Sequence, residues 1–226
     1  SARSAVLTWD VVPGDGAAIT DGSGLWLDGA GNWNTGAGDT TWNSVTPDSA
    51  ILGGGGGSGG IVTMNGPITA GALTFNSTGY LLDTTINTTG LTLGGGITVN
   101  AAATNAAITG HINFNAAGAS VFTVAPGATL ALRSLVANVN DNYYSTVGGG
   151  GTVTVYCAAL PQYASVGSGY SFYVNTLSNG TTLVVNNGTA YANLGGGIQG
   201  ALQINSGGRF YNNTFHVFDR GAGTAI

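Results

Sequence analysis

The segment Gly71-Ala-Leu-Thr-Phe-Asn76 sets the pattern that decides the fold. A glycine opens the segment, apolar residues alternate with a polar one, and an asparagine closes it, which is typical of a short strand with one buried face. Glycine permits the positive φ of a corner, and asparagine tolerates the left-handed conformation better than most residues. The pattern recurs in Gly60-Ile-Val-Thr-Met-Asn65, Gly96-Ile-Thr-Val-Asn100, Gly110-His-Ile-Asn-Phe-Asn115 and Gly200-Ala-Leu-Gln-Ile-Asn205.

A repeated short strand, corner and short strand is typical of one edge of a coiled β-solenoid. We therefore expect an all-β protein built as a β-solenoid. The alternative is a β-sandwich of many short strands. A sandwich usually has longer strands and more charge on its outer faces than this sequence offers.

The chain divides into three regions of different composition. Residues 1–52 hold all four tryptophans and six of the nine aspartates, and we expect them to form an N-terminal cap or assembly segment. Residues 53–60 form a glycine-rich loop, and residues 61–226 are the expected solenoid. Because an open solenoid end is prone to aggregation, large side chains should cover it. The predicted cap residues are Trp26, Trp33 and Trp42.

The charge composition excludes several classes of function. Charged residues make up 6% of the chain, the net charge is -5, and the sequence contains neither lysine nor glutamate. Four scattered arginines do not form the basic surface that nucleic acids require. Catalysis by lysine or glutamate is excluded, and we expect no enzymatic activity. No run of 18 apolar residues occurs, so we expect no transmembrane helix.

A Trp-rich opening followed by a series of short strands extends from Leu7 to about Ile108. It comprises Trp26, Asn32-Trp33, Trp42, Asp48-Ser-Ala-Ile51, Gly71-Ala-Leu-Thr-Phe75, Thr78-Gly-Tyr-Leu-Leu82, Leu91-Thr-Leu-Gly-Gly95 and Ile97-Thr-Val99. This stretch resembles the autotransporter-associated β-strand repeat region of large bacterial surface and secreted proteins. The resemblance implies a right-handed parallel β-helix that is exported, often without enzymatic activity. We accordingly expect an extracellular or cell-surface protein whose signal peptide has been removed.

Three Asp-Gly pairs in the N-terminal region, beginning at Asp15, Asp21 and Asp28, raise the question of a metal site. Asp21-Gly22 and Asp28-Gly29 are turn signals, and we interpret them first as structural turns that need no cofactor. The alternative is that Asp21 and Asp28, with nearby carbonyls, hold Ca²⁺, which takes six to eight oxygen ligands. Neither an EF-hand loop nor the glycine- and aspartate-rich calcium repeat is present.

The preferred functional hypothesis is a structural protein that assembles with copies of itself. Low charge limits repulsion between copies, and strand-like segments occur near both ends of the chain. Strand addition between these ends would give a head-to-tail contact that propagates into a surface filament or matrix fibre. The predicted assembly residues are Val6, Leu7, Trp9, Val11, Phe215, Val217 and Phe218. The alternative is an adhesin or passenger domain that binds glycan or a cell surface.

Overall fold

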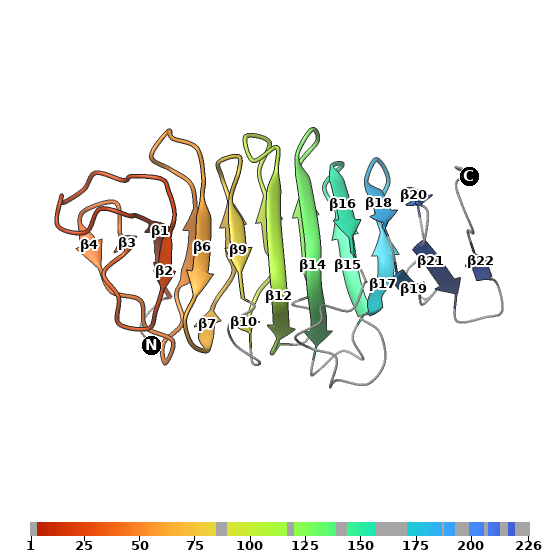
Figure 1. The fold of residues 1–226 in the computed structure, drawn as a ribbon, viewed down its shortest axis with the longest axis horizontal. Helices are drawn as coiled ribbons and strands as arrows, with labels where there is room; N and C mark the ends of the chain where they lie inside the picture. The colour runs from red at the N-terminus through yellow and green to blue at the C-terminus, as the bar shows by residue number, and fades with distance from the viewer. Residues whose placement is uncertain are drawn as a thin grey trace.

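A computed structural model describes residues 4–84, 90–116, 120–138, 144–156, 171–186, 188–192, 199–205, 208–212 and 217–219. Within these residues every regular element is a β-strand, which confirms the all-β prediction. The described residues contain no long apolar helix of the kind that crosses a bilayer. The strands follow one another along the long axis of the molecule (Figure 1).

The strands form two large, mostly parallel sheets. The order in the twelve-stranded sheet is β22 (Val217–Asp219), β21 (Gly208–Asn212), β19 (Gly188–Ala192), β17 (Ser171–Leu177), β15 (Tyr144–Gly148), β13 (Val121–Val124), β11 (Ile97–Val99), β8 (Leu73–Phe75), β5 (Ser49–Leu52), β1 (Val6–Trp9), β3 (Trp33–Asn34) and β4 (Asp39–Thr40). The order in the ten-stranded sheet is β2 (Gly24–Trp26), β6 (Ile61–Met64), β9 (Leu81–Asp83), β12 (Ala106–Phe114), β14 (Thr129–Asn138), β16 (Thr152–Val155), β18 (Thr182–Val185) and β20 (Ala201–Ile204). Off this order, β10 (Leu91–Leu93) pairs with β12, and β7 (Ile68–Ala70) pairs with β10.

Neighbouring strands within each sheet are mostly parallel, and residues of one kind lie in register. Thr98 of β11 lies between Thr74 of β8 and Thr123 of β13. Between β8 and β11, and again between β11 and β13, the chain passes through the ten-stranded sheet. This parallel pairing differs from the antiparallel sheets on which the β-sandwich alternative is built.

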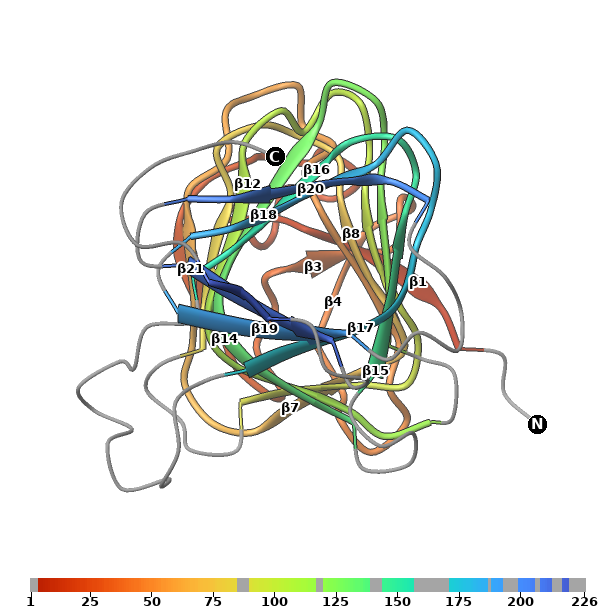
Figure 2. The ribbon, with the colours of Figure 1, turned by 90° about the vertical axis from the view of Figure 1, so that its right-hand side faces the viewer.

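The core lies between the two sheets. In β8, Leu73 and Phe75 are buried while Thr74 is only partly so, which is the alternation that the sequence predicted. Each fully buried side chain of this size contributes roughly 1.5–3 kcal/mol. Viewed along the long axis, β18 and β20 lie on one side of the interior and β17 and β19 on the other (Figure 2).

A glycine lies in the middle of the nine-residue strand β12. Gly110, in the middle of β12, has a φ of +112°, which side chains rarely tolerate. Before it, β12 pairs with β9, and after it with β10. Strand β12 therefore changes direction at Gly110 and pairs with β9 and then with β10.

Both ends of the twelve-stranded sheet depart from parallel pairing. At the N-terminal end, β3 pairs antiparallel with β1, and β4 pairs antiparallel with β3. At the other end, β22 pairs antiparallel with β21. The alternation of apolar and polar residues predicts strands but does not indicate that these strands reverse direction.

Candidate functional site

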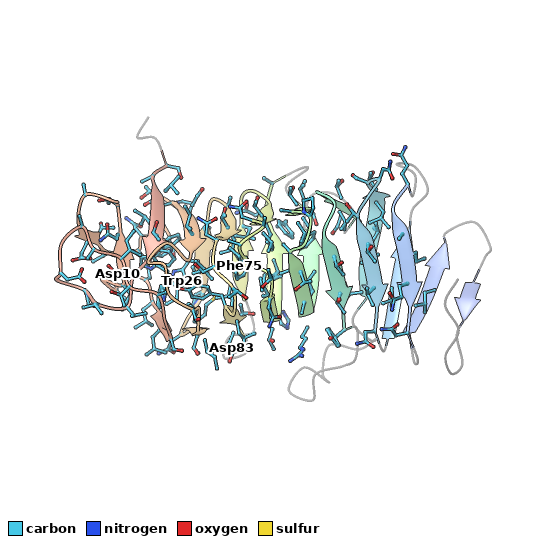
Figure 3. The ribbon with its side chains drawn as sticks, turned by 90° about the horizontal axis from the view of Figure 1, so that it is seen from above. Asp10, Trp26, Phe75 and Asp83 are labelled. Atoms are coloured by element: carbon cyan, nitrogen blue, oxygen red, sulfur yellow. The ribbon has the colours of Figure 1, made fainter. Side chains whose placement is uncertain are left out.

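The N-terminal end holds four tryptophans that we call the tryptophan cluster: Trp9, Trp26, Trp33 and Trp42. All four side chains are buried, and the ring centroids of contacting pairs lie 4.6 to 5.4 Å apart. Edge and tilted contacts of this kind contribute about 0.5–1.5 kcal/mol per pair beyond the burial itself. The structure thus brings the three predicted cap residues together and adds Trp9 to them. Trp26 lies near the N-terminal end of the stack of strands (Figure 3).

The four indoles differ in hydrogen bonding. Trp9 Nε1 donates to the Gly22 carbonyl at 3.0 Å, and Trp42 Nε1 donates to the Thr69 carbonyl at 3.2 Å. The Nε1 groups of Trp26 and Trp33 are buried without a hydrogen-bond partner. Because the rings pack against one another inside the protein, their faces are not available to stack on an external sugar.

Beside the tryptophan cluster, two buried polar side chains hold the loop between β1 and β2. Asp10 Oδ1 accepts the backbone N–H groups of Val12 and Thr20, each at 3.1 Å. Asn34 Nδ2 donates to the carbonyl of Gly16 at 2.7 Å. Since a buried polar group without a partner is costly, these bonds make both side chains compatible with the interior.

Asp39 of β4 holds the same loop from another side. Its Oδ2 accepts the N–H groups of Gly14 at 2.8 Å and Gly16 at 3.2 Å. Carboxylate oxygens of Asp10, Asp15 and Asp39 lie within 4.8 Å of one another, so among the described residues this trio could hold a metal ion. Desolvation, together with the negative charges of Asp10 and Asp39, raises the pKa of Asp15 above its ordinary value.

The predicted calcium ligands, Asp21 and Asp28, have separate structural roles. Asp21 accepts two N–H groups of the glycine-rich loop, at 2.9 and 3.1 Å, and the Tyr80 hydroxyl at 2.9 Å. Burial and this bond to Asp21 raise the pKa of Tyr80, which keeps the phenol protonated as a donor. Asp28 accepts the N–H of Ser44 at 2.7 Å. In the described part of the chain, neither carboxylate belongs to a group of three or more acidic, histidine or cysteine ligands.

The glycine-rich loop packs closely on the segment that precedes β2. A Cβ on Gly55 would overlap the carbonyl oxygen of Ile19, and a Cβ on Gly60 would overlap Ser23. Glycine is therefore required at these two positions by close approach of backbone to backbone. Together with Asp21, the loop ties the N-terminal region to the strands that follow.

The predicted assembly residues of the N-terminal end face in different directions. Val6 is 56% exposed, whereas Leu7 and Trp9 are buried and Val11 packs partly against the core. Strand β1 is hydrogen-bonded to β5 on one side and to β3 on the other. Of this set, the side chains of Leu7 and Trp9 pack in the interior of their own chain.

The predicted assembly residues of the C-terminal end lie at the limit of the described structure. Val217 and Phe218 belong to β22, where they stand in register with Tyr211 and Phe210 of β21. Phe215 lies outside the described residues. The role of these residues in assembly remains a prediction.

The chain is similar to the adhesin BmaC autotransporter of Brucella suis biovar 1 (strain 1330), with 37% identity over 120 residues. The similarity covers 53% of this chain and 3% of that protein, so the chain spans a small fraction of the length of the curated relative it matches. No family model matches the chain. No solved structure matches it with significance.

Proposed function

We propose that this chain is an adhesin-like, non-enzymatic segment of a bacterial surface protein. The observation that carries the proposal is its similarity, over half of its length, to an autotransporter adhesin. A surface sparse in charge and two long, mostly parallel sheets agree with a segment that extends from a cell and presents side chains to a target.

The same proposal includes a right-handed parallel β-helix as the architecture. Three features support it: mostly parallel pairing along both sheets, alternation of the chain between the sheets, and a core that, among the described residues, runs from Leu7 to Ile204. Parallel strands joined by a crossover connection are right-handed in nearly all proteins, because a right-twisted strand favours that connection.

A display experiment tests the proposed adhesion. The chain is fused to an unrelated outer-membrane anchor on a non-adherent bacterium, and bacteria bound to an epithelial monolayer are counted. We expect a several-fold increase over bacteria carrying the same anchor with an unrelated β-sheet domain of similar size. Equal counts at equal surface expression would contradict the proposed function.

Filament assembly is a second candidate, favoured by the terminal strands of the ten-stranded sheet. β2 and β20 stand at the two ends of that sheet, and a terminal strand offers backbone groups to another chain. Negative-stain electron microscopy of the purified chain tests this idea. Uniform fibres with a regular subunit repeat would support assembly, and short monodisperse particles at high concentration would refute it.

A further inference from the structure

Four polar side chains occupy one row on the ten-stranded sheet, which we call the arginine row: Arg133, Tyr156, Asn186 and Asn205. Arg133 belongs to β14, and the other three residues directly follow β16, β18 and β20, which lie beyond β14 in the sheet (Figure 1). The N–H of each residue after Arg133 donates to the carbonyl of the buried residue that precedes its neighbour in the row, at 2.8 to 2.9 Å. Adjacent strands lie about 4.8 Å apart, so the row is about 14 Å long.

The arginine row faces away from the core. The residues that directly precede its members are all buried: Leu132, Val155, Val185 and Ile204. Successive side chains of a strand point to opposite faces of the sheet, so the row belongs to the outer face. Arg133 is exposed, and the other three side chains are partly exposed. A ligand can therefore approach all four from solvent.

A tyrosine ring holds the guanidinium of Arg133. Arg133 Cζ lies over the ring of Tyr156, 5.0 Å from its centroid, which is within the range of a cation–π contact. A guanidinium over a ring uses its flat face for that contact, and its N–H edges remain available as donors. These N–H groups form a rigid fork that matches the two oxygens of a carboxylate. Because the ring already restricts the side chain, less conformational freedom is lost when the fork binds a ligand.

The described residues beside Arg133 include no carboxylate that would neutralise it. Thr109 of β12 is in register with Arg133 on one side and with Asp83 of β9 on the other. Two strand spacings, about 10 Å, separate the backbones of Asp83 and Arg133, and charges at such a separation are largely screened at physiological salt concentration. The other aspartate side chains that the structure describes lie within residues 1–52. Arg133 therefore presents an isolated and oriented positive charge.

We propose that the arginine row binds a glycan that ends in one acidic sugar, with the sugar carboxylate on the guanidinium of Arg133. The inference rests on the adhesin-like function proposed above and names the class of its ligand. A carboxylate accepts two N–H groups of an arginine fork in a strong, charge-assisted pair. The amides of Asn186 and Asn205 offer donors and acceptors to the hydroxyl groups of the sugars that follow along the row. Gln203 Nε2 donates to Asn205 Oδ1 at 2.8 Å, which orients that amide.

The charge distribution favours a ligand with a single acidic group. The arginine row holds one positive charge, whereas the whole chain carries a net charge of -5. A polyanion such as heparin requires a cluster of basic residues and would be repelled by an acidic chain. A neutral glycan would leave the oriented fork of Arg133 without an anion. A glycan that is uncharged apart from one carboxylate satisfies both conditions.

The test presents the full chain to an array of neutral, sialylated, glucuronate-terminated and sulfated glycans. Calorimetry then compares the carboxylated glycan that binds best with its carboxyl amide, which has a similar shape but no negative charge. Arg133→Gln removes the fork, and Arg133→Lys keeps the charge without the fork. Thr123→Asp is the matched control, because it lowers the net charge by the same amount as Arg133→Gln at an exposed position of the twelve-stranded sheet. Circular dichroism melting establishes that each variant is folded.

We expect the acid to bind about tenfold more tightly than its amide, and Arg133→Gln to weaken binding of the acid by about the same factor. Arg133→Lys should bind more weakly than wild type, and Thr123→Asp should bind as wild type does. Absence of binding, a preference for neutral or sulfated glycans, equal affinity for the acid and its amide, or wild-type affinity of a folded Arg133→Gln variant would overturn the proposal. If Arg133→Gln fails to fold, the comparison of acid and amide still decides, because it uses the unaltered chain.

The display experiment separates this proposal from the adhesin function. Adherence that survives enzymatic removal of terminal acidic sugars from the monolayer would overturn the acidic ligand and leave the adhesin function standing. Binding of the purified chain to the acidic glycan, without adherence of the displayed chain, would support the ligand and contradict the adhesin function.

Discussion

Replacing single tryptophans by phenylalanine gives a direct test of how the N-terminal end is stabilised. Trp33→Phe and Trp42→Phe remove the same atoms from the same buried cluster, and each ring keeps aromatic neighbours. The loss of apolar contact is therefore similar in the two variants. They differ in one respect: Trp42 donates a hydrogen bond to Thr69, whereas the N–H of Trp33 has no partner.

That difference sets the expected magnitude. Trp42→Phe leaves a carbonyl without its donor, which costs about 1–3 kcal/mol when the group is buried. Trp33→Phe removes an unpaired buried N–H, a change that offsets part of the lost packing. We therefore expect Trp42→Phe to lower the free energy of unfolding by about 1–3 kcal/mol more than Trp33→Phe. Trp9 and Trp26 form a second pair of the same kind, since the former donates a hydrogen bond and the latter does not.

The assay is urea unfolding followed by far-ultraviolet circular dichroism, because fluorescence would change with the substitution itself. Linear extrapolation gives the free energy of unfolding, and an unchanged slope shows that the variants expose the same surface. Trp33→Phe at least as destabilising as Trp42→Phe, repeated in the Trp26 and Trp9 pair, would refute the assignment of the hydrogen bonds.

Three further predictions concern charge and pH. Asp15→Asn should stabilise the protein at neutral pH, because the raised pKa of Asp15 in the folded state means that its negative charge opposes folding. Thermal melting measures this gain in stability. The gain should shrink as the pH falls through the raised pKa towards 3.8, the ordinary value. Burial lowers the pKa of His111, so the free energy of unfolding should fall as the pH drops below about 6.5, the pKa of the unfolded state. His111→Leu should make the free energy of unfolding less dependent on pH. Urea titrations at pH 7.5 and 5.5 measure the difference. Asp21→Asn replaces one acceptor oxygen of the carboxylate that holds the glycine-rich loop. The free energy of unfolding should fall by about 1–3 kcal/mol, and proteases should cleave the loop faster. An unchanged cleavage rate would contradict the role of Asp21 in holding the loop.

Local strand pattern was predictable from the sequence because it follows from alternation alone. The segments beginning at Gly71 and Gly96 contain β8 and β11, whose apolar residues are buried as expected. Alternation reports that one face of a strand is buried, but not which chain covers it. For that reason the alternation of β1 allows an assembly role for Leu7 and Trp9, whose side chains the structure packs within the chain. Their role in assembly stays a prediction.

Contacts that depend on long-range register were not predictable. Asp10, Asn34 and Asp39 meet because β1, β3 and β4 pair antiparallel, and no spacing in the sequence signals that reversal. The Asp-Gly pairs at 21 and 28 were recognised as turns, but their hydrogen-bond partners come from distant residues such as Tyr80. Turn chemistry is local, whereas the partner of a carboxylate is set by the whole fold.

The parallel stacking of neighbouring strands has a consequence for how the chain acquires its structure. Where each layer contacts only the layers beside it, stability is approximately a sum of terms for single layers and for neighbouring pairs, and order can spread from one point. The four contacting indoles make the N-terminal end a strong starting point. We expect each later layer to form on the template of the one before, so that folding proceeds with a direction along the rod.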